Sequence, residues 1–156
     1  MADFKQQSRL LAIDTPLGDD VFLLTRLAGE ESVSALFGIE IEAYSLRKDI
    51  TPAEIVGQNV TLKIAATDES ALFLPDSYRY INGYIKSFRQ EGRQLQDLRG
   101  YSAVVVPWLW FLTQTSDCKI FQFKNIQEIA TAIFEENGFT DFQFRLVGQH
   151  PARDYC

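Results

Sequence analysis

Histidine and cysteine are scarce in this chain of 156 residues, which has one His and two Cys. His150 stands alone, and Cys118 and Cys156 are far apart with no Cys-x-x-Cys spacing. Protein zinc sites need about three or four such ligands, so we predict no metal site and no cofactor. Neither cysteine has the flanking residues typical of a Cys/His hydrolase. We expect both thiols to be reduced, with a disulfide between them as the alternative.

Long apolar runs and nucleotide-binding motifs are also missing. No run of about eighteen apolar residues is present, so no helix is expected to span a bilayer. The first eight residues, MADFKQQS, lack the apolar core of a classical secretory signal. There is no G-x-G-x-x-G and no P-loop. A net charge of −6 argues against a surface that follows nucleic-acid phosphates, so no nucleic-acid partner is predicted.

Neighbouring acidic residues are the remaining candidates for acid/base chemistry. The three pairs are Asp19-Asp20, Glu30-Glu31 and Glu135-Glu136. Each falls in a predicted turn or on the polar side of a predicted helix, which favours solvated charge over a catalytic dyad. His150, beside Pro151 and Arg153, could bind an anion, but a structural or solvated role is the better interpretation. We therefore predict no catalytic residue and assign no binding residue.

The residues that are abundant indicate a strand-rich core. Hydrophobic residues make up 46% of the chain and aromatic residues 13%. Between residues 36 and 46, Phe37, Ile39, Ile41 and Ala43 alternate with polar positions, which predicts a half-buried strand. Thr51, Pro52 and Glu54 carry the cap, first-turn proline and capping box of one helical turn. The predicted strands are 8–13, 21–27 (broken by residues 29–32), 36–46, 60–64, 78–89 and 95–106, and residues 67–75 are predicted to be a loop.

The last two strands are predicted to form a hairpin. Residues 90–94 would be its turn, with Gly92 in a left-handed position, while Gly83 and Gly100 lie inside the strands and permit bends or bulges. Residues 78–89 are apolar on both faces, with Tyr80, Tyr84 and Phe88 on one and Ile81, Gly83 and Ile85 on the other. Such strands favour a closed or well-covered sheet, that is, a barrel or sandwich.

The pattern becomes mixed α and β at Pro107. Trp108, Phe111 and Leu112 are spaced for a short helix. Asn125 and Glu128 predict the capped start of a longer one, and Gly138 predicts its end, with Phe139 folding back onto the last turn. The helix carries an apolar stripe, Ile126, Ile129, Ala130, Ile133 and Phe134. Residues 141–147 alternate again, with Phe142, Phe144 and Leu146 on one face, which predicts another strand.

Six aromatic residues allow two interpretations. Trp108, Trp110, Tyr78, Tyr80, Tyr84 and Tyr101 could form a stacking surface for sugars, which would make the chain a carbohydrate-binding barrel. The favoured interpretation is that these rings fill the core and the seam between strands and helices.

Three segments carry a family resemblance. They are VVVPWLWFLTQTSDCKIFQ (104–122), ALFGIEIEAYS (35–45) and VGQHPARDYC (147–156). In composition and order they resemble the N-terminal region of VgrG proteins, the spike of the bacterial type VI secretion system, from about Arg9 to the last residue. The residues alone would indicate only a strand-rich domain, so the functional expectations come from this resemblance.

The resemblance implies a fold similar to the baseplate hub of contractile phage tails. It implies an α+β, mainly β chain, with a tube-type β-barrel over residues 1–106 and the incomplete start of a second α/β hub domain over 107–156. It also implies a homotrimer that stacks on the Hcp tube and contacts baseplate proteins. A PAAR-type tip and effectors would bind a C-terminal spike. Assembly would be cytoplasmic, with export through the type VI system rather than by a signal peptide.

This interpretation assigns no enzymatic activity to the present region and leaves the C-terminal part of such a protein open. Two alternatives remain: the N-terminal part of a secreted effector enzyme, and the carbohydrate-binding barrel.

Overall fold

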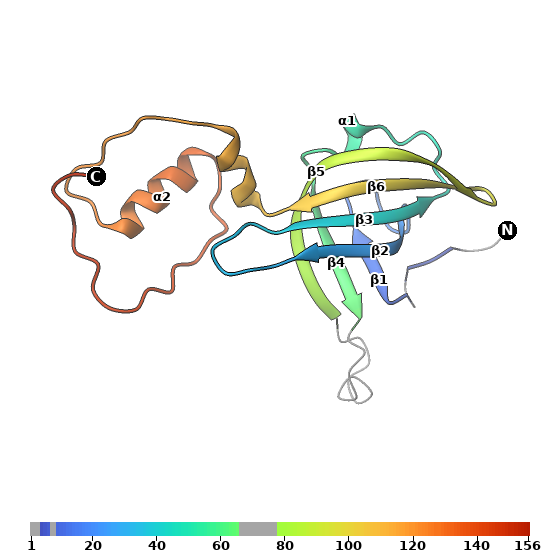
Figure 1. Cartoon of the computed structure of the whole chain (residues 1–156), viewed down its shortest axis with the longest axis horizontal. Coiled ribbons are helices and arrows are strands. Elements are labelled where there is room, and N and C mark those ends of the chain that lie inside the picture. The colour runs from blue at the N-terminus through green and yellow to red at the C-terminus, as the bar shows by residue number, and fades with distance from the viewer. Residues whose placement is uncertain (1–3, 7–8, 66–77) are drawn as a thin grey trace, which may run out of the picture. The chain divides into compact units, whose positions relative to one another are not determined.

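The computed structural model describes residues 4–6, 9–65 and 78–156, so the predicted loop 67–75 lies outside the described residues. The chain divides into two compact units, Met1–Pro107 and Trp108–Cys156. Figure 1 shows the strands of the first unit and the helix of the second. We describe each unit separately.

The first unit is built on one antiparallel sheet of six strands in the order β1-β4-β5-β6-β3-β2. All six lie at or near segments that the sequence predicts. The predicted break at residues 29–32 begins too early, because β2 continues through Gly29, which pairs with Ile39, and ends at Glu30. The strands are β1 (Leu11–Asp14), β2 (Leu23–Glu30), β3 (Gly38–Ser45), β4 (Asn59–Ala65), β5 (Tyr78–Leu95) and β6 (Leu98–Val106).

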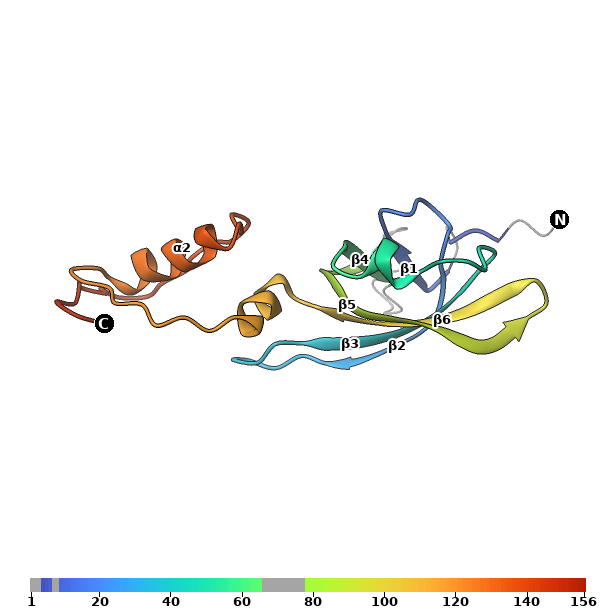
Figure 2. The same ribbon diagram turned by 90° about the horizontal axis from the view of Figure 1, so that it is seen from above.

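The sheet curls around a single core. Ile13 of β1 and Leu24 of β2 belong to the same buried cluster, although these two strands lie at opposite ends of the strand order. Figure 2 shows β1 and β4 turned over β2 and β3. A flat sheet could not bring its two edges to one core, so the sheet forms part of a barrel. The prediction of a mainly β, barrel-type fold with short helices is confirmed.

Helix α1 (Pro52–Ile55) has the predicted capping. Glu54 Oε2 accepts hydrogen bonds from the Thr51 main-chain N–H (2.8 Å) and hydroxyl (3.0 Å). Ile55 points into the core, where it is almost fully buried. The helix therefore anchors the connection between β3 and β4 to the core of the curled sheet.

The predicted hairpin turn at residues 90–94 is wrong. Strand β5 continues to Leu95, which pairs with Leu98, so the turn residues are Gln96 and Asp97. Gln96 takes the left-handed conformation, with φ of 53°. Residues 91–93 instead form a bulge, since Gln90 pairs with Tyr101 and Gln94 with Arg99. Gly100 lies opposite the bulge, where a Cβ would come within 3.1 Å of the Arg93 carbonyl oxygen.

A second bulge changes which face Phe88 occupies. The register of β5 against β6 shifts between Ile85 and Ser87, and this shift turns Phe88 to the side of Ile85. Phe88 then packs against the core, whereas Tyr80 is exposed. The predicted grouping of Phe88 with Tyr80 and Tyr84 is therefore wrong.

The second unit contains a 3-10 helix η2 (Trp108–Gln114) and helix α2 (Ile126–Glu136). Asn125 Oδ1 accepts from the Glu128 N–H (2.9 Å), as the capping box predicts. Gly138 has φ of 81°, and the Phe139 N–H donates to the Phe134 carbonyl at 2.9 Å. These bonds form a Schellman motif and confirm the predicted end of α2.

The strand predicted at residues 141–147 is absent. The described residues from 108 onward contain one isolated bridge, between Lys124 and Arg153, but no strand. Phe142 and Phe144 still lie against Phe134 of α2, with ring centroids 5.0 and 6.4 Å from it. The alternation at 141–147 thus reflects packing of aromatic rings on a helix and not strand pairing.

Candidate functional site

Residues typical of catalysis or metal binding do not converge in the described part of the chain. There, no three His, Cys, Asp or Glu side chains come together in a way that could hold a metal ion. His150 is exposed. Cys118 and Cys156 are both exposed free thiols. No helix among the described residues is long and apolar enough to cross a membrane.

The three acidic pairs lie apart, and one member of each bonds to a distant segment of the chain. Asp20 accepts a hydrogen bond from the Gln6 main-chain N–H (2.7 Å). Glu31 forms an ion pair with Arg79, and Glu136 with Lys119. Each of these contacts joins two segments of the chain, and no two of the pairs come together as a catalytic dyad would require.

The tyrosines of the proposed stacking surface divide between core and exterior. Tyr101 is 1% exposed, while Tyr80 is 60% exposed beside Tyr78, at a centroid distance of 6.3 Å. Burial raises the pKa of the Tyr101 hydroxyl, which donates to the Arg47 carbonyl at 2.9 Å. Tyr101 therefore acts in packing, and the four tyrosines do not form one platform.

The two tryptophans occupy different positions in the second unit. The ring of Trp108 stacks on Phe139 (4.6 Å) and meets Phe134 edge-on (5.0 Å). Trp110 contacts Phe111 edge-on at 5.5 Å. Both indoles are half-buried. Trp108 thus lies at the centre of the aromatic cluster that packs on α2.

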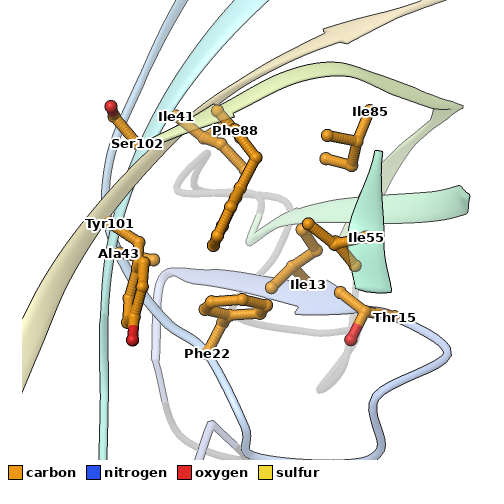
Figure 3. A pocket seen from close by; sticks show the side chains of 11 residues that line it. Ile13, Thr15, Phe22, Ile41, Ala43, Ile55, Ile85, Phe88, Tyr101 and Ser102 are labelled. Atoms are coloured by element: carbon orange, nitrogen blue, oxygen red, sulfur yellow. The ribbon is translucent and has the colours of Figure 1, made fainter. Parts of the chain in front are cut away.

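The cavity inside the curled sheet is too small for a ligand. Its volume is about 10 Å³, roughly the room that one water molecule needs. Figure 3 shows Phe22, Phe88 and Tyr101 around it, with Ile13 and Ile55 completing the wall. Phe22 meets the Phe88 and Tyr101 rings edge-on, at 5.9 and 5.8 Å. The interior of the sheet is therefore a packed core.

A charged groove lies on the opposite face of the sheet. Its volume is about 480 Å³, and it crosses strands β2, β3, β6 and β5. Glu42 Oε1 pairs with Arg26 (3.3 Å), and Glu42 Oε2 pairs with Arg93 (2.8 Å). Glu91 accepts from the Ser102 hydroxyl (2.6 Å) and from Arg89 (3.0 Å), and these bonds, the first most strongly, lower its pKa.

Sequence reasoning did not find this groove. The available signal was that Glu40 and Glu42 occupy the outward positions of β3. The partners Arg89, Glu91 and Arg93 could not be aligned with them, because the two bulges of β5, between Ile85 and Ser87 and between Gln90 and Gln94, set their direction. The groove is open and carries both charge signs, which suits contact with another polypeptide better than binding of a small molecule.

The fold and these surfaces together define a barrel-type β module with a packed interior and polar exterior strands. Residues 30–156 match the family model described as phage tail baseplate hub (GPD). The chain belongs to the phage tail baseplate hub family.

Curated relatives give the same result. The chain is 35% identical over 154 residues to the type VI secretion system spike protein VgrG1c of Pseudomonas aeruginosa. It is 35% identical over 152 residues to VgrG1a of the same organism. These matches cover 98% and 97% of this chain but only 20% and 22% of the relatives. The chain thus spans about one fifth of the length of these proteins, and the resemblance to VgrG proteins is confirmed.

A solved structure supports the fold. It is that of the E. coli c3393 protein, described as a component of the type VI secretion system with structural similarity to the T4 bacteriophage tail proteins gp27 and gp5. The TM-score is 0.72 at 21% identity, over 93% of this chain and 38% of the other. At this identity the likeness concerns the fold alone.

Proposed function

We propose that this chain is the N-terminal part of a spike and hub component of a type VI secretion system, with a structural role and no enzymatic one. The match of residues 30–156 to the baseplate hub family carries the proposal. The similarity to spike proteins over nearly the whole chain supports it. Residues 1–106 would be the hub-type barrel and residues 107–156 the beginning of a second hub domain.

The proposed assembly is a homotrimer that docks on the Hcp tube and contacts baseplate proteins. The charged groove supports this, since Arg26, Arg89 and Arg93 alternate with Glu42 and Glu91 on an open strand face. Alternating charges fix the register of a protein–protein contact more than they add to its affinity. The net charge of −6 is one reason why nucleic acid is not among the proposed partners.

Further partners would bind outside the present residues. The relatives are much longer than this chain, which covers 20% and 22% of the two described above. We place the contacts with a PAAR-type tip and with effectors in such a C-terminal region. The complex would assemble in the bacterial cytoplasm, leave the cell without a signal peptide when the sheath contracts, and puncture the target cell to deliver effectors.

Export provides the test. Culture supernatants are compared from the wild type, a mutant whose sheath cannot contract, and a deletion of this gene, with a cytoplasmic protein as the control for lysis. We expect this protein in the wild-type supernatant only, and loss of released Hcp in the deletion. The proposal fails if the protein leaves the sheath mutant without lysis. It also fails if Hcp release survives the deletion with no related spike gene present.

A further inference from the structure

The barrel is open along one seam, where the edge strands β1 and β2 face each other. No ladder of main-chain hydrogen bonds joins these two strands in the described residues. An apolar groove of about 640 Å³ follows the seam, lined by Leu10, Leu11, Leu24 and Ile64 among others. Leu10 is 64% exposed there. Unpaired edges beside apolar surface are templates for pairing with another chain.

Gln6 occupies the free edge of β1. Its Oε1 accepts from the Ile13 N–H (2.7 Å), and its Nε2 donates to the Ile13 carbonyl (3.1 Å). Ile13 lies opposite Leu62 of β4 but directs both main-chain groups to Gln6. One side-chain amide therefore makes the pair of hydrogen bonds that a residue of a neighbouring strand would make.

Arg9 occupies the edge of β2 at the same seam. Its Nη2 donates to the Leu24 carbonyl at 3.2 Å. Leu24 stands at the start of the β2 bulge, where the register shifts between Leu24 and Arg26. The Arg9 N–H donates to the Gln6 carbonyl (3.0 Å), and the Gln6 N–H to Asp20 (2.7 Å). These bonds hold the two side chains in place together.

We propose that Gln6 and Arg9 guard the seam against strand addition and so prevent self-association through β1 and β2. The two side chains occupy the Ile13 N–H and carbonyl and the Leu24 carbonyl, so an incoming strand could not bond to these main-chain groups. This role goes beyond the proposed secretion function and does not depend on it. Charged and polar side chains placed at sheet edges are a general protection against pairing.

The test uses the full chain with Gln6→Ala and Arg9→Ala combined, compared with the wild type and with Gln122→Ala, an exposed glutamine in the other unit, as the matched control. Two quantities are measured: hydrogen exchange of the Ile13 amide, and molar mass by light scattering over a range of concentrations. We expect Ile13 to exchange about tenfold faster. We also expect the mass of the double variant to rise with concentration above that of the wild type.

A third substitution separates strand addition from general unfolding. Leu10→Lys, added to the double variant, places a charge in the seam groove and should return the mass to the wild-type value. If the double variant fails to fold, the same two measurements are made on Gln6→Asn, which keeps the amide but is one methylene too short to reach Ile13. The proposal is overturned if the folded double variant keeps the wild-type mass or the wild-type exchange rate of Ile13. It is also overturned if Leu10→Lys does not reverse the association, or if Gln6→Asn behaves like the wild type.

Discussion

The ring of Tyr101 stacks on the ring of Phe88, with centroids 5.2 Å apart and planes inclined by 16°. The two residues come from neighbouring strands, and the β5 bulge between Ile85 and Ser87 is what brings Phe88 to this face. The stack closes the core beside Phe22. The barrel therefore depends on a bulge as much as on its apolar residues.

Tyr101→Ala should be strongly destabilising, because it removes a buried ring that contacts two others. We expect a loss of about 3–5 kcal/mol in the free energy of unfolding. Tyr101→Phe keeps the stack but leaves the Arg47 carbonyl without its donor, at a cost of about 1 kcal/mol. Chemical denaturation measures both. Tyr80→Ala, at an exposed position, is the control and should stay within about 0.5 kcal/mol of the wild type; an equal loss at Tyr80 and Tyr101 would contradict the buried stack.

Substitution by alanine should leave stability nearly unchanged at Gly92 but lower it at Gly100. Gly92→Ala should be tolerated, since a Cβ at Gly92 would meet no other atom within 4 Å and the residue is not in a left-handed conformation. Gly100→Ala brings a Cβ within 3.1 Å of the Arg93 carbonyl and should cost about 1–3 kcal/mol. Thermal melting of the two variants decides. A larger loss of stability in Gly92→Ala than in Gly100→Ala would instead support the predicted turn at residues 90–94.

Gln96→Gly tests the turn itself. Gln96 has φ of 53°, a conformation that glycine adopts without strain. We expect this substitution to leave stability unchanged or to raise it by up to about 1 kcal/mol, as relief of the strained conformation offsets the entropy of glycine. The midpoint of urea unfolding is the measurement. A loss above about 1 kcal/mol would contradict the position of the turn.

Trp108→Ala should destabilise the second unit more than Trp110→Ala. Trp108 contacts both Phe134 and Phe139, so its loss opens the aromatic cluster on α2. Because the indole is only half-buried, we expect up to about 3 kcal/mol, the lower end for a buried Trp. Near-ultraviolet circular dichroism during unfolding reports on this cluster. If both variants stay folded and lose affinity for an oligosaccharide, that result would support the carbohydrate-binding interpretation.

Glu54 should make stability depend on pH in the acid range. Hydrogen bonds from the Thr51 N–H and from Arg47 lower its pKa from 4.5 to about 2. A carboxylate with a lowered folded pKa stabilises the fold above its unfolded pKa, and this contribution is lost as pH falls through the folded value. Between pH 4.5 and 2 the unfolding free energy should therefore fall with a smaller slope in Glu54→Gln than in the wild type. Glu30→Gln, at an exposed strand end, is the control; identical slopes in all three proteins would refute the assignment.

Local signals in the sequence were sufficient for the helix ends and strand faces. Asn125 with Glu128, and Thr51 with Glu54, act within four residues, and the alternation of Ile39, Ile41 and Ala43 is visible without a partner strand. The hairpin prediction failed because Gly92 marks a turn by composition, while the real turn at Gln96 has no glycine.

The other errors have a nonlocal cause. The face of Phe88 depends on a register against β6, and pairing of residues 141–147 requires a neighbour that their own alternation does not specify. For the candidate site, alternation alone predicted the outward positions of β3 but not the arginines opposite them. The functional prediction rests on the family motifs, because composition and residue spacing indicated no catalytic or metal-binding site.

The strand order has a consequence for synthesis. Ile39 of β3 pairs with Val105 of β6, and Leu11 of β1 pairs with Ile64 of β4, so the sheet is assembled by pairing between distant parts of the chain. Sheets dominated by such pairings fold in roughly milliseconds to seconds. On the ribosome, β2 and β3 can form their hairpin early, but the core stays uncovered until β6 has emerged. Nascent chains shorter than about a hundred residues should therefore be the form that most requires a chaperone.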